Sequence, residues 1–157
     1  MKIQIKSFED LTRLELYDIL KKRQEIFVVE QKICYLDVDG KDPYSLHFWY
    51  PGETSHDILA YVRMVPEKEK KEVSIGRVLT APSARGQGLA RQLTKEALAY
   101  WRSHYPNWPL HLHAQEYLRG FYESLGFEVT GPVFCYPDED PLPHVPMVYK
   151  PSLPSTP

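Results

Sequence analysis

The sequence lacks the features that mark three large classes of protein. Its 157 residues carry a formal net charge of −2, so no basic excess is available to neutralise the phosphates of a nucleic acid. Its unbroken apolar runs, such as Ile26 to Val29, are far shorter than the roughly 20 residues that cross a bilayer. The N-terminal segment MKIQIKSFED alternates, instead of showing the apolar core of a signal peptide. We therefore expect no nucleic-acid partner, no membrane partner and a cytoplasmic location.

Cysteine is scarce, and its spacing excludes the common cysteine-based sites. Cys34 and Cys135 lie far apart, and neither is part of a C-x-x-C or a Cys/His metal pattern. We expect both to be reduced and buried, because a free cysteine behaves as a small apolar side chain. His111 and His113 share one face of a predicted strand, but no third ligand has suitable spacing, so no metal site is expected.

Proline, in contrast, is abundant, and it marks the end of the chain. Several of the 14 prolines gather in PSLPSTP, residues 151–157, a composition that does not support a packed core. No internal repeat divides the remainder of the chain. We predict a single domain over residues 1–150, followed by a Pro/Ser-rich tail over residues 151–157.

Apolar periodicity predicts strands and helices that follow one another along the chain. Period-2 patterns and short apolar runs favour strands over residues 2–6, 45–50, 58–65, 73–80, 110–114, 127–131 and 144–150. Helical spacing favours helices over residues 14–27, 89–104 and 116–125. Thr12 and Glu15 form a capping box before the first helix, and Gly126 ends the third. The order is βαβββαβαββ, which predicts a mixed sheet with a polar, proline-rich loop between the last two strands.

The segment DVDGKD, residues 37–42, has the composition of a calcium loop but not its spacing. The glycine and the glutamate that an EF-hand requires fall on Asp42 and Phe48, so we expect an Asp-Gly turn instead. This acidic segment and the two arginines Arg63 and Arg77 are expected to bind either a substrate or one another.

The turn RGQGLA, residues 85–90, separates a predicted strand from the longest predicted helix. Two glycines at a helix start cost roughly 1 kcal/mol each relative to alanine, which indicates a need for bare backbone. The first amides of a helix lack internal partners and carry partial positive charge, and glycine lets phosphate oxygens approach them. Arg85 adds a forked donor. The turn therefore predicts a pyrophosphate site, and a tight turn without a ligand stays open as the alternative.

Two common phosphate loops do not fit this turn. The lysine and hydroxyl residue of a Walker A loop are absent, and Arg91 stands where a dinucleotide-binding fingerprint has its third glycine. That fingerprint also opens its domain, whereas several predicted strands precede this turn. Glu116, after the next strand, can imitate the acid that binds a ribose, so dinucleotide binding stays open as a minor alternative.

These residues resemble a known superfamily. The pattern R-x-x-G-x-A at residues 85–90, between a strand and a long helix, is similar to the [Q/R]-x-x-G-x-[G/A] signature of the GNAT superfamily of N-acetyltransferases. The segments RQEIFVVEQKICYLDVDGKD, IGRV, HAQ, FYESLGF and H-x-x-M (residues 144–147) match its ElaA-like subfamily in order. The resemblance covers the chain from Ile5 to Tyr149. It implies a GNAT fold of the α/β (α+β) class, with a central mixed, mostly antiparallel β-sheet flanked by helices.

The same resemblance implies a reaction. It names acetyl-CoA as the cosubstrate, without a metal, and the amine of an unidentified small-molecule or peptide acceptor as the group that receives the acetyl by direct transfer. A noncatalytic acyl-CoA-binding or sensing module on the same fold is the alternative, because fold does not fix function. A homodimer is left open.

The match also implies which residues bind acetyl-CoA. The end of the strand before the turn is expected to pair with the pantetheine amides, as an added strand would, through Val78, Leu79 and Thr80. The pyrophosphate is expected on the turn itself, which comprises Arg85, Gly86, Gln87, Gly88, Leu89 and Ala90. Gln115 is expected either to bind pantetheine or to cap the helix that follows it.

Three further residues are candidates for the chemistry. Tyr122 matches the tyrosine that protonates the coenzyme A sulfur, and the alternative is a core tyrosine that packs beside Phe121. Glu30 and His47 match the acceptor side of the family and are candidate bases. A buried, hydrogen-bonded role for each of them, with ordered water as the proton acceptor, stays open.

Overall fold

A computed structural model describes residues 2–54, 56–137 and 140–150. The tail predicted over residues 151–157 lies outside the described residues. In the described part of the chain, no helix is long and apolar enough to cross a membrane. The expected cytoplasmic location stays a prediction.

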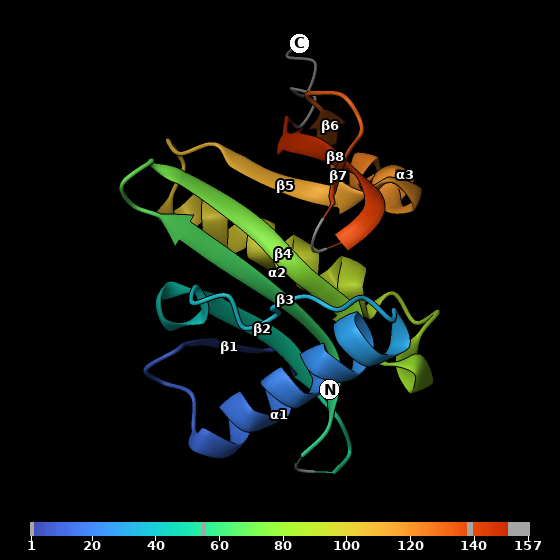
Figure 1. The fold of residues 1–157 in the computed structure, drawn as a ribbon. Coiled ribbons are helices and arrows are strands. Elements are labelled where there is room, and N and C mark those ends of the chain that lie inside the picture. Colours follow the sequence, from blue (N-terminus) through green and yellow to red (C-terminus); the bar gives the residue numbers. More distant parts are fainter. Residues whose placement is uncertain (1, 55, 138–139, 151–157) are drawn as a thin grey trace.

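One sheet organises the described residues, and its order is β1-β2-β3-β4-β5-β8-β6, with β7 paired to β8 (Figure 1). The strands are β1 Gln4–Ser7, β2 Leu46–Pro51, β3 Ile58–Glu67, β4 Glu72–Thr80, β5 Leu110–Gln115, β6 Phe127–Val129, β7 Phe134–Tyr136 and β8 Asp140–Tyr149. All of these pairings are antiparallel except that of β4 with β5, which is parallel. The predicted mixed, mostly antiparallel sheet is therefore confirmed.

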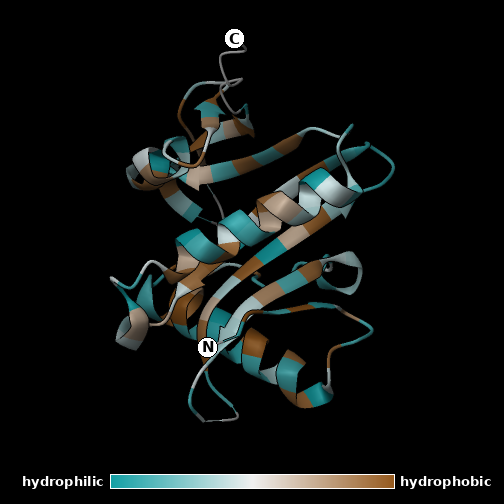
Figure 2. Cartoon of the chain, turned by 180° about the vertical axis from the view of Figure 1, so that it is seen from behind, coloured by the Kyte–Doolittle hydropathy of each residue, from teal (hydrophilic) through white to brown (hydrophobic). Residues whose placement is uncertain are grey.

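Helices cover both faces of the sheet (Figure 1). α1 (Arg13–Arg23) lies on one face, and α2 (Leu89–His104) crosses the other, with α3 (Arg119–Glu123) beside the end of β5. Figure 2 shows the α2 side, where apolar residues of the helix alternate with polar ones along its length. Four short helical segments complete the described part of the chain: η1 (Gln24–Glu30), η2 (Asp42–Tyr44), η3 (Pro82–Ala84) and η4 (Glu116–Leu118).

The core has two parts, one on each face of the sheet. The larger part joins α2 to the sheet, and Leu93 and Ala97 of α2 are fully buried in it against side chains such as Val62 of β3. The smaller part joins α1 to the opposite face through Ile19 and Tyr61. Because side chains alternate across a strand, the faces can be assigned residue by residue. This assignment decides which side chains reach the candidate site.

The first predicted helix ends earlier than its apolar spacing indicates. A capping box of Thr12 and Glu15 starts α1 as predicted, but regular α-helix ends at Arg23. The next seven residues form a π-helix, in which the Gln31 amide donates to the Ile26 carbonyl at 3.1 Å. The sequence of this segment includes Val28 and Val29, whose β-branched side chains favour helix weakly. The wider turns carry the chain on to Glu30.

Two other expectations are wrong. Cys34 and Cys135 are free, but both are exposed, because one lies in the loop over residues 31–41 and the other in the short strand β7. The proline-rich segment that was expected as a loop forms β7 and a longer β8. Phe134 and Tyr136 pair there with His144 and Asp140. Pairing across this hairpin outweighs the proline content.

Candidate active site

The glycine turn, residues 85–90, presents open backbone at the start of α2. Gly86 and Gly88 have φ values of 85° and 73°, which lie in the left-handed region that glycine alone adopts easily. A Cβ added at either residue would meet nothing within 4 Å, so the space beside the backbone is free. Gly88 is the N-cap of α2 and provides no side-chain cap, and the first hydrogen bond of the helix runs from the Gln92 amide to the Gly88 carbonyl at 3.1 Å.

The amides of the glycine turn form a group of unused donors. Within the described residues, no backbone amide from Arg85 to Arg91 donates a hydrogen bond to a protein acceptor. Unpartnered amides at the positive end of a 16-residue helix make a site for an anion. The glycines do permit the bend, and the same bend leaves the donors open. The geometry therefore fits a phosphate group.

Arg85 lies at the mouth of the glycine turn and is held by an acidic side chain. Its two terminal nitrogens lie 2.7 and 2.8 Å from the two carboxylate oxygens of Glu30, at the end of η1. Its Nε donates to the Thr80 carbonyl at 3.3 Å. The hydrogen bond from Arg85 lowers the pKa of Glu30, which weakens this carboxylate as a base. Glu30 thus contacts Arg85, the side chain that is predicted to bind the phosphate.

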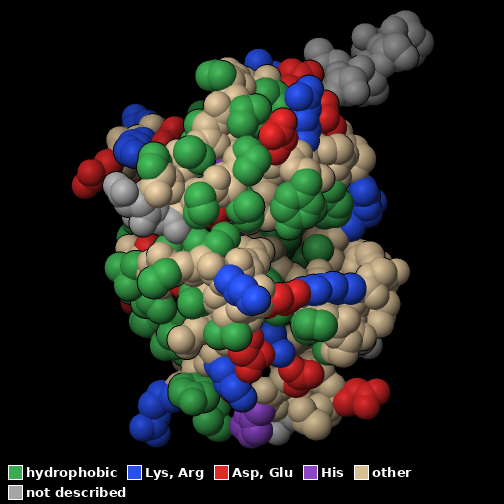
Figure 3. Space-filling model, turned by 45° about the vertical axis from the view of Figure 1, so that its right-hand side comes forward, with side chains coloured by type: hydrophobic (Ala, Val, Ile, Leu, Met, Phe, Trp, Pro, Cys, Tyr) green, Lys and Arg blue, Asp and Glu red, His purple; other side chains and the backbone are tan. Residues whose placement is uncertain are grey.

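β4 and β5 separate soon after they begin. Their parallel pairing is limited to Val73 with Leu110 and Ser74 with His111. Beyond Ser74 the two strands diverge toward the side where α3 and the glycine turn lie (Figure 1). We call this branching point the β4–β5 fork. Figure 3 shows that side of the molecule, where the surface is hollowed and basic and acidic side chains alternate below the hollow.

The open edge of β4 is formed by two of the three predicted backbone positions. The Ala81 amide donates to the Leu59 carbonyl at 2.8 Å, and Thr80 lies opposite Ala60. In an antiparallel ladder this arrangement turns the amide and carbonyl of Leu79 toward β3. The backbone groups of Val78 and Thr80 point the other way, into the fork. Val78 and Thr80 are therefore the residues that can pair with an added chain.

Tyr122 and Gln115 lie on the β5 side of the fork. Tyr122, on α3, is 5% exposed and contacts Phe121 and Phe127 edge-to-face, with ring centroids 5.0 and 5.9 Å apart. Burial raises the pKa of its phenol, so the group is protonated at neutral pH. Its hydroxyl makes no hydrogen bond to another described residue. Gln115 ends β5 and stands at the N-cap position of η4, but its side chain makes no capping hydrogen bond there.

His47 lies inside the molecule and not in the fork. Its side chain is fully buried on β2, with Nδ1 2.6 Å from the Tyr61 hydroxyl and Nε2 3.2 Å from the Asp42 carbonyl. Burial lowers its pKa. Because both ring nitrogens have partners, this geometry favours the buried, hydrogen-bonded role over that of a base.

An ionic network fixes the loop over residues 31–41 across the sheet. Its members are Arg23, Arg63, Arg77, Asp37, Asp39 and Asp42. Arg23 is fully buried and reaches Asp37 at 3.0 Å and Asp42 at 2.5 Å. Arg63 binds both oxygens of Asp39 at 2.8 Å. Of the two uses left open for the acidic segment, pairing with the arginines is the one that the structure shows. No group of three or more metal-ligating side chains occurs among the described residues.

Comparisons with known proteins agree with this geometry. Residues 47–151 match the family described as "Acetyltransferase (GNAT) domain". A UPF0039 protein of Synechocystis sp. is 35% identical over 91% of this chain and 91% of its own. Crystal structures of an acyl-CoA N-acyltransferase from Pseudomonas aeruginosa and of Escherichia coli ElaA superpose with TM-scores of 0.86 and 0.85. They are 35% and 32% identical, and each match covers 95% of this chain and 99% of the other.

The chain belongs to the GNAT acetyltransferase family, and within it to the ElaA-like proteins. The predicted family and fold class are thereby confirmed. Membership supports an acyl-CoA-dependent N-acyltransferase activity. The acyl group, the acceptor and the residues that serve them belong to the proposals below.

One feature of this GNAT domain was not predicted from its sequence. Arg77, within β4, has a φ of 52°, and the β3–β4 register shifts between Tyr61 and Arg63. The strand therefore bulges just before its open edge. Gly76, beside the bulge, was the residue that could have indicated it, because glycine inside a strand pattern often marks a bulge. Arg77 itself is an unusual residue for the left-handed region.

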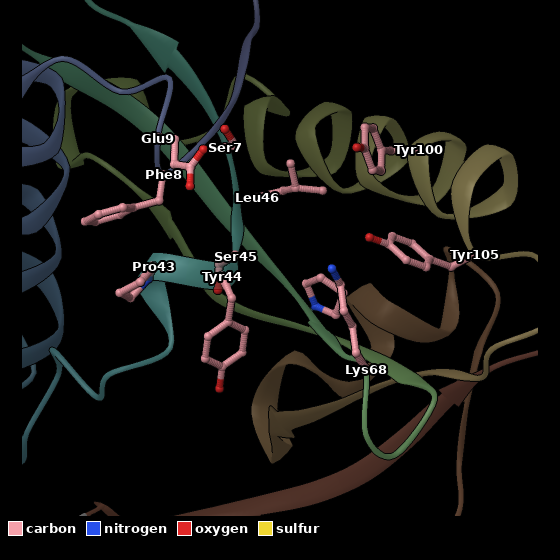
Figure 4. Close-up of a pocket in the computed structure, with 11 residues that line it drawn as sticks. Ser7, Phe8, Glu9, Pro43, Tyr44, Ser45, Leu46, Lys68, Tyr100 and Tyr105 are labelled. Carbon is pink, nitrogen blue, oxygen red and sulfur yellow. The ribbon is translucent and has the colours of Figure 1, made fainter.

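A separate hollow lies at the far end of α2 (Figure 4). Its walls include Tyr44, Lys68, Tyr100 and Tyr105. Tyr100 and Tyr105 stand at the C-terminal end of the helix, and the glycine turn stands at the N-terminal end. Since a 16-residue helix is about 24 Å long, this hollow is remote from the fork.

Proposed function

We propose that this GNAT protein is an acetyl-CoA-dependent N-acetyltransferase that moves the acetyl group directly to the amine of an acceptor. One observation carries the proposal: open amides at the glycine turn and an open backbone edge on β4 lie next to each other in the chain. The first suits a pyrophosphate, and the second suits the amides of pantetheine. Coenzyme A contains both groups in that order.

The geometry of the glycine turn supports a set of binding residues. Gly86, Gln87, Gly88, Leu89 and Ala90 offer backbone amides to the pyrophosphate, and bare glycine backbone lets the oxygens approach. Arg85 adds charge once it exchanges or shares its contact with Glu30.

The edge of β4 orients the rest of the cosubstrate. Val78 and Thr80 pair with pantetheine as an additional strand would. Gln115, across the fork, has a side chain without a capping hydrogen bond and supplies a further amide.

Tyr122 is the proton donor in this proposal. When bound, acetyl-CoA supplies an activated acyl group whose transfer leaves a thiolate. The phenol of Tyr122 stays protonated because burial raises its pKa, and its hydroxyl is not engaged by another described residue. It can therefore give its proton to the sulfur.

An assay of coenzyme A release tests the proposal. The purified protein is incubated with acetyl-CoA and a panel of amines that includes polyamines, amino acids, aminoglycosides and peptides. With at least one amine, we expect coenzyme A to be released faster than by background hydrolysis. Mass spectrometry then identifies the acetylated amine. Binding of acetyl-CoA without turnover of any panel member would favour the noncatalytic module. If acetyl-CoA does not bind and no panel amine is acetylated, the proposal is overturned.

A further inference from the structure

His113 stands on β5 at the β4–β5 fork. The last position of β5 that pairs with β4 is His111, opposite Ser74, and His113 is the next residue on the same face of the strand. Leu112 and Ala114, between and beyond, are buried in the core on the α2 face. The His113 side chain therefore lies on the opposite face, where β5 leaves β4.

The matching position on β4 is a glycine. Gly76 lies two residues beyond Ser74, as His113 lies two residues beyond His111. A Cβ added at Gly76 would meet nothing within 4 Å, so space is open over the strand there. This space adjoins the last residues of β4 before its open edge. An acyl-CoA whose pantetheine pairs with that edge would direct its acyl group toward the space over Gly76.

A tyrosine holds the His113 ring in place. Nδ1 of His113 lies 2.5 Å from the Tyr136 hydroxyl of β7, and Phe134 contacts the ring edge-to-face at 5.1 Å. Nε2 of His113 makes no hydrogen bond within the described part of the chain, and the residue is exposed. When Nδ1–H donates to the tyrosine oxygen, Nε2 keeps its lone pair.

The two neighbouring histidines differ from His113 in this respect. His144 of β8 is buried, with Nδ1 2.7 Å from the Leu142 carbonyl and Nε2 3.4 Å from Asp140. His111 lies 3.5 Å from Glu72, on the closed side of the fork. His113 is thus the histidine of this cluster that presents a ring nitrogen to the open space.

The surroundings keep the His113 ring neutral. One part of the exposed His113 side chain is shielded from water, and this partial desolvation lowers its pKa. The positive charge that His111, His144 or Lys41 can carry lowers the pKa further. The acidic groups nearby, Glu72 and Asp140, are directed to the other two histidines.

We propose that His113 is the general base that accepts a proton from the acceptor amine, which binds in the open space over Gly76. This inference rests on the proposed function. As the amine nitrogen bonds to the acyl carbon, its proton moves to Nε2 of His113. The carbon–sulfur bond breaks, and Tyr122 protonates the sulfur. Solvent then carries a proton from the imidazolium to the tyrosinate, which restores both residues. Tyr136 acts as a positioning residue.

Bromoacetyl-CoA tests this placement without a known acceptor. Its CH2 carbon would occupy the position of the acetyl methyl carbon. A ring nitrogen close to that carbon displaces bromide, forms a carbon–nitrogen bond and releases a proton to solvent. Peptide mapping by mass spectrometry locates the adduct. Only adducts that excess coenzyme A prevents are counted, and bromoacetamide identifies nonspecific reaction at exposed Cys34 and Cys135.

We expect a coenzyme A-protected adduct on His113 in the wild type and in His111→Gln, and its loss in His113→Gln. All three proteins are first checked for stabilisation by acetyl-CoA in a thermal unfolding assay. A wild-type protein that acetyl-CoA stabilises but that carries its protected adduct elsewhere, or carries none, overturns the role of His113 and leaves the proposed function standing. A wild-type protein that acetyl-CoA does not stabilise overturns both.

Discussion

The carboxylate of Glu30 and the guanidinium of Arg85 face each other in a two-bond ion pair, with N–O distances of 2.7 and 2.8 Å. Glu30 is the last residue of the π-helix after α1, and Arg85 is the first residue of the glycine turn. The pair therefore joins the end of η1 to the glycine turn. A phosphate bound at the turn would compete with Glu30 for the same donors. The pair therefore connects cosubstrate binding to the segment that precedes the loop over residues 31–41.

Glu30→Gln is expected to raise the affinity for acetyl-CoA, because the variant removes both the competitor for Arg85 and a negative charge near the phosphates. The pair is exposed and such pairs are weak, so the gain is less than about fivefold. Calorimetry with acetyl-CoA measures it. Glu25→Gln is the matched control, since Glu25 pairs with Lys21 and Lys22 instead. A lower affinity in Glu30→Gln would contradict the competition.

Arg85→Ala is expected to weaken acetyl-CoA binding. A charge-assisted hydrogen bond contributes about 1.5–3 kcal/mol, or roughly 10- to 100-fold, and the exchange with Glu30 brings the loss to the lower end of that range. Equilibrium titration against acetyl-CoA gives the change in Kd. Arg119→Ala serves as a control, because Arg119 is an exposed arginine that pairs with Glu123 within its own helix. Equal affinities of Arg85→Ala and the wild type for acetyl-CoA would show that Arg85 does not bind the phosphate.

Tyr122→Phe is expected to lower kcat by about 10²–10⁴-fold, the usual contribution of a general acid. The ring contacts with Phe121 and Phe127 remain, and the lost hydroxyl has no hydrogen-bond partner among the described residues, so Tm should not fall. Steady-state kinetics with a panel amine and a thermal melt check both statements. Tyr117→Phe removes an exposed hydroxyl nearby and is expected to keep kcat. Near-normal turnover of Tyr122→Phe, with acyl transfer rate-limiting, would leave Tyr122 as a packing residue.

The ionic network predicts sensitivity to acid. Burial alone would raise the pKa of Asp39, but hydrogen bonds and charge from Arg63 outweigh it and lower the pKa below its ordinary value of 3.8. The pKa of Asp42 is lowered in the same way, mainly by Arg23. Groups whose pKa is lower in the folded state stabilise it above the unfolded pKa, and this stability is lost as pH falls from about 4 downward.

Urea unfolding at pH values from 7 to 3 measures this loss. Asp39→Asn is expected to be less stable than the wild type at neutral pH and to lose less stability between about pH 4 and pH 3, because one titrating group is gone. Glu69→Gln, in an exposed turn, should follow the wild-type curve. An acid limb that is equally steep in Asp39→Asn would show that Asp39 does not contribute to it.

Much of the fold could be predicted from local pattern. The strong apolar stripe of α2 and its start at Leu89 were predicted to the residue, because the glycine turn sets its beginning. The end of α1 could not be predicted, because apolar residues continue past Arg23 and no local signal marks the change to a π-helix. The pairing of β7 with β8 joins segments whose prolines favour a loop, and only the fold brings them together.

The candidate site, like the fold, could be predicted only where consecutive residues determine it. The glycine turn and the end of β4 carry their chemistry in consecutive residues, so a motif predicts them. The contact between Glu30 and Arg85, and the burial of His47 against Tyr61, depend on packing between distant segments. From the sequence, His113 was noted only together with His111, as two possible metal ligands on one face of a strand. Its hydrogen bond to Tyr136 comes from a strand that the pattern did not predict.

The most direct test of the account is a titration of ¹⁵N-labelled protein with acetyl-CoA, followed by the amide resonances. The central claim is that open amides of the glycine turn and the open edge of β4 hold the cosubstrate. We expect the largest shifts at residues 86–91 and at Val78 and Thr80, with little change at Tyr100 and Tyr105 beside the remote hollow. Saturation without shifts in the turn, or with the largest shifts around that hollow, would contradict the account.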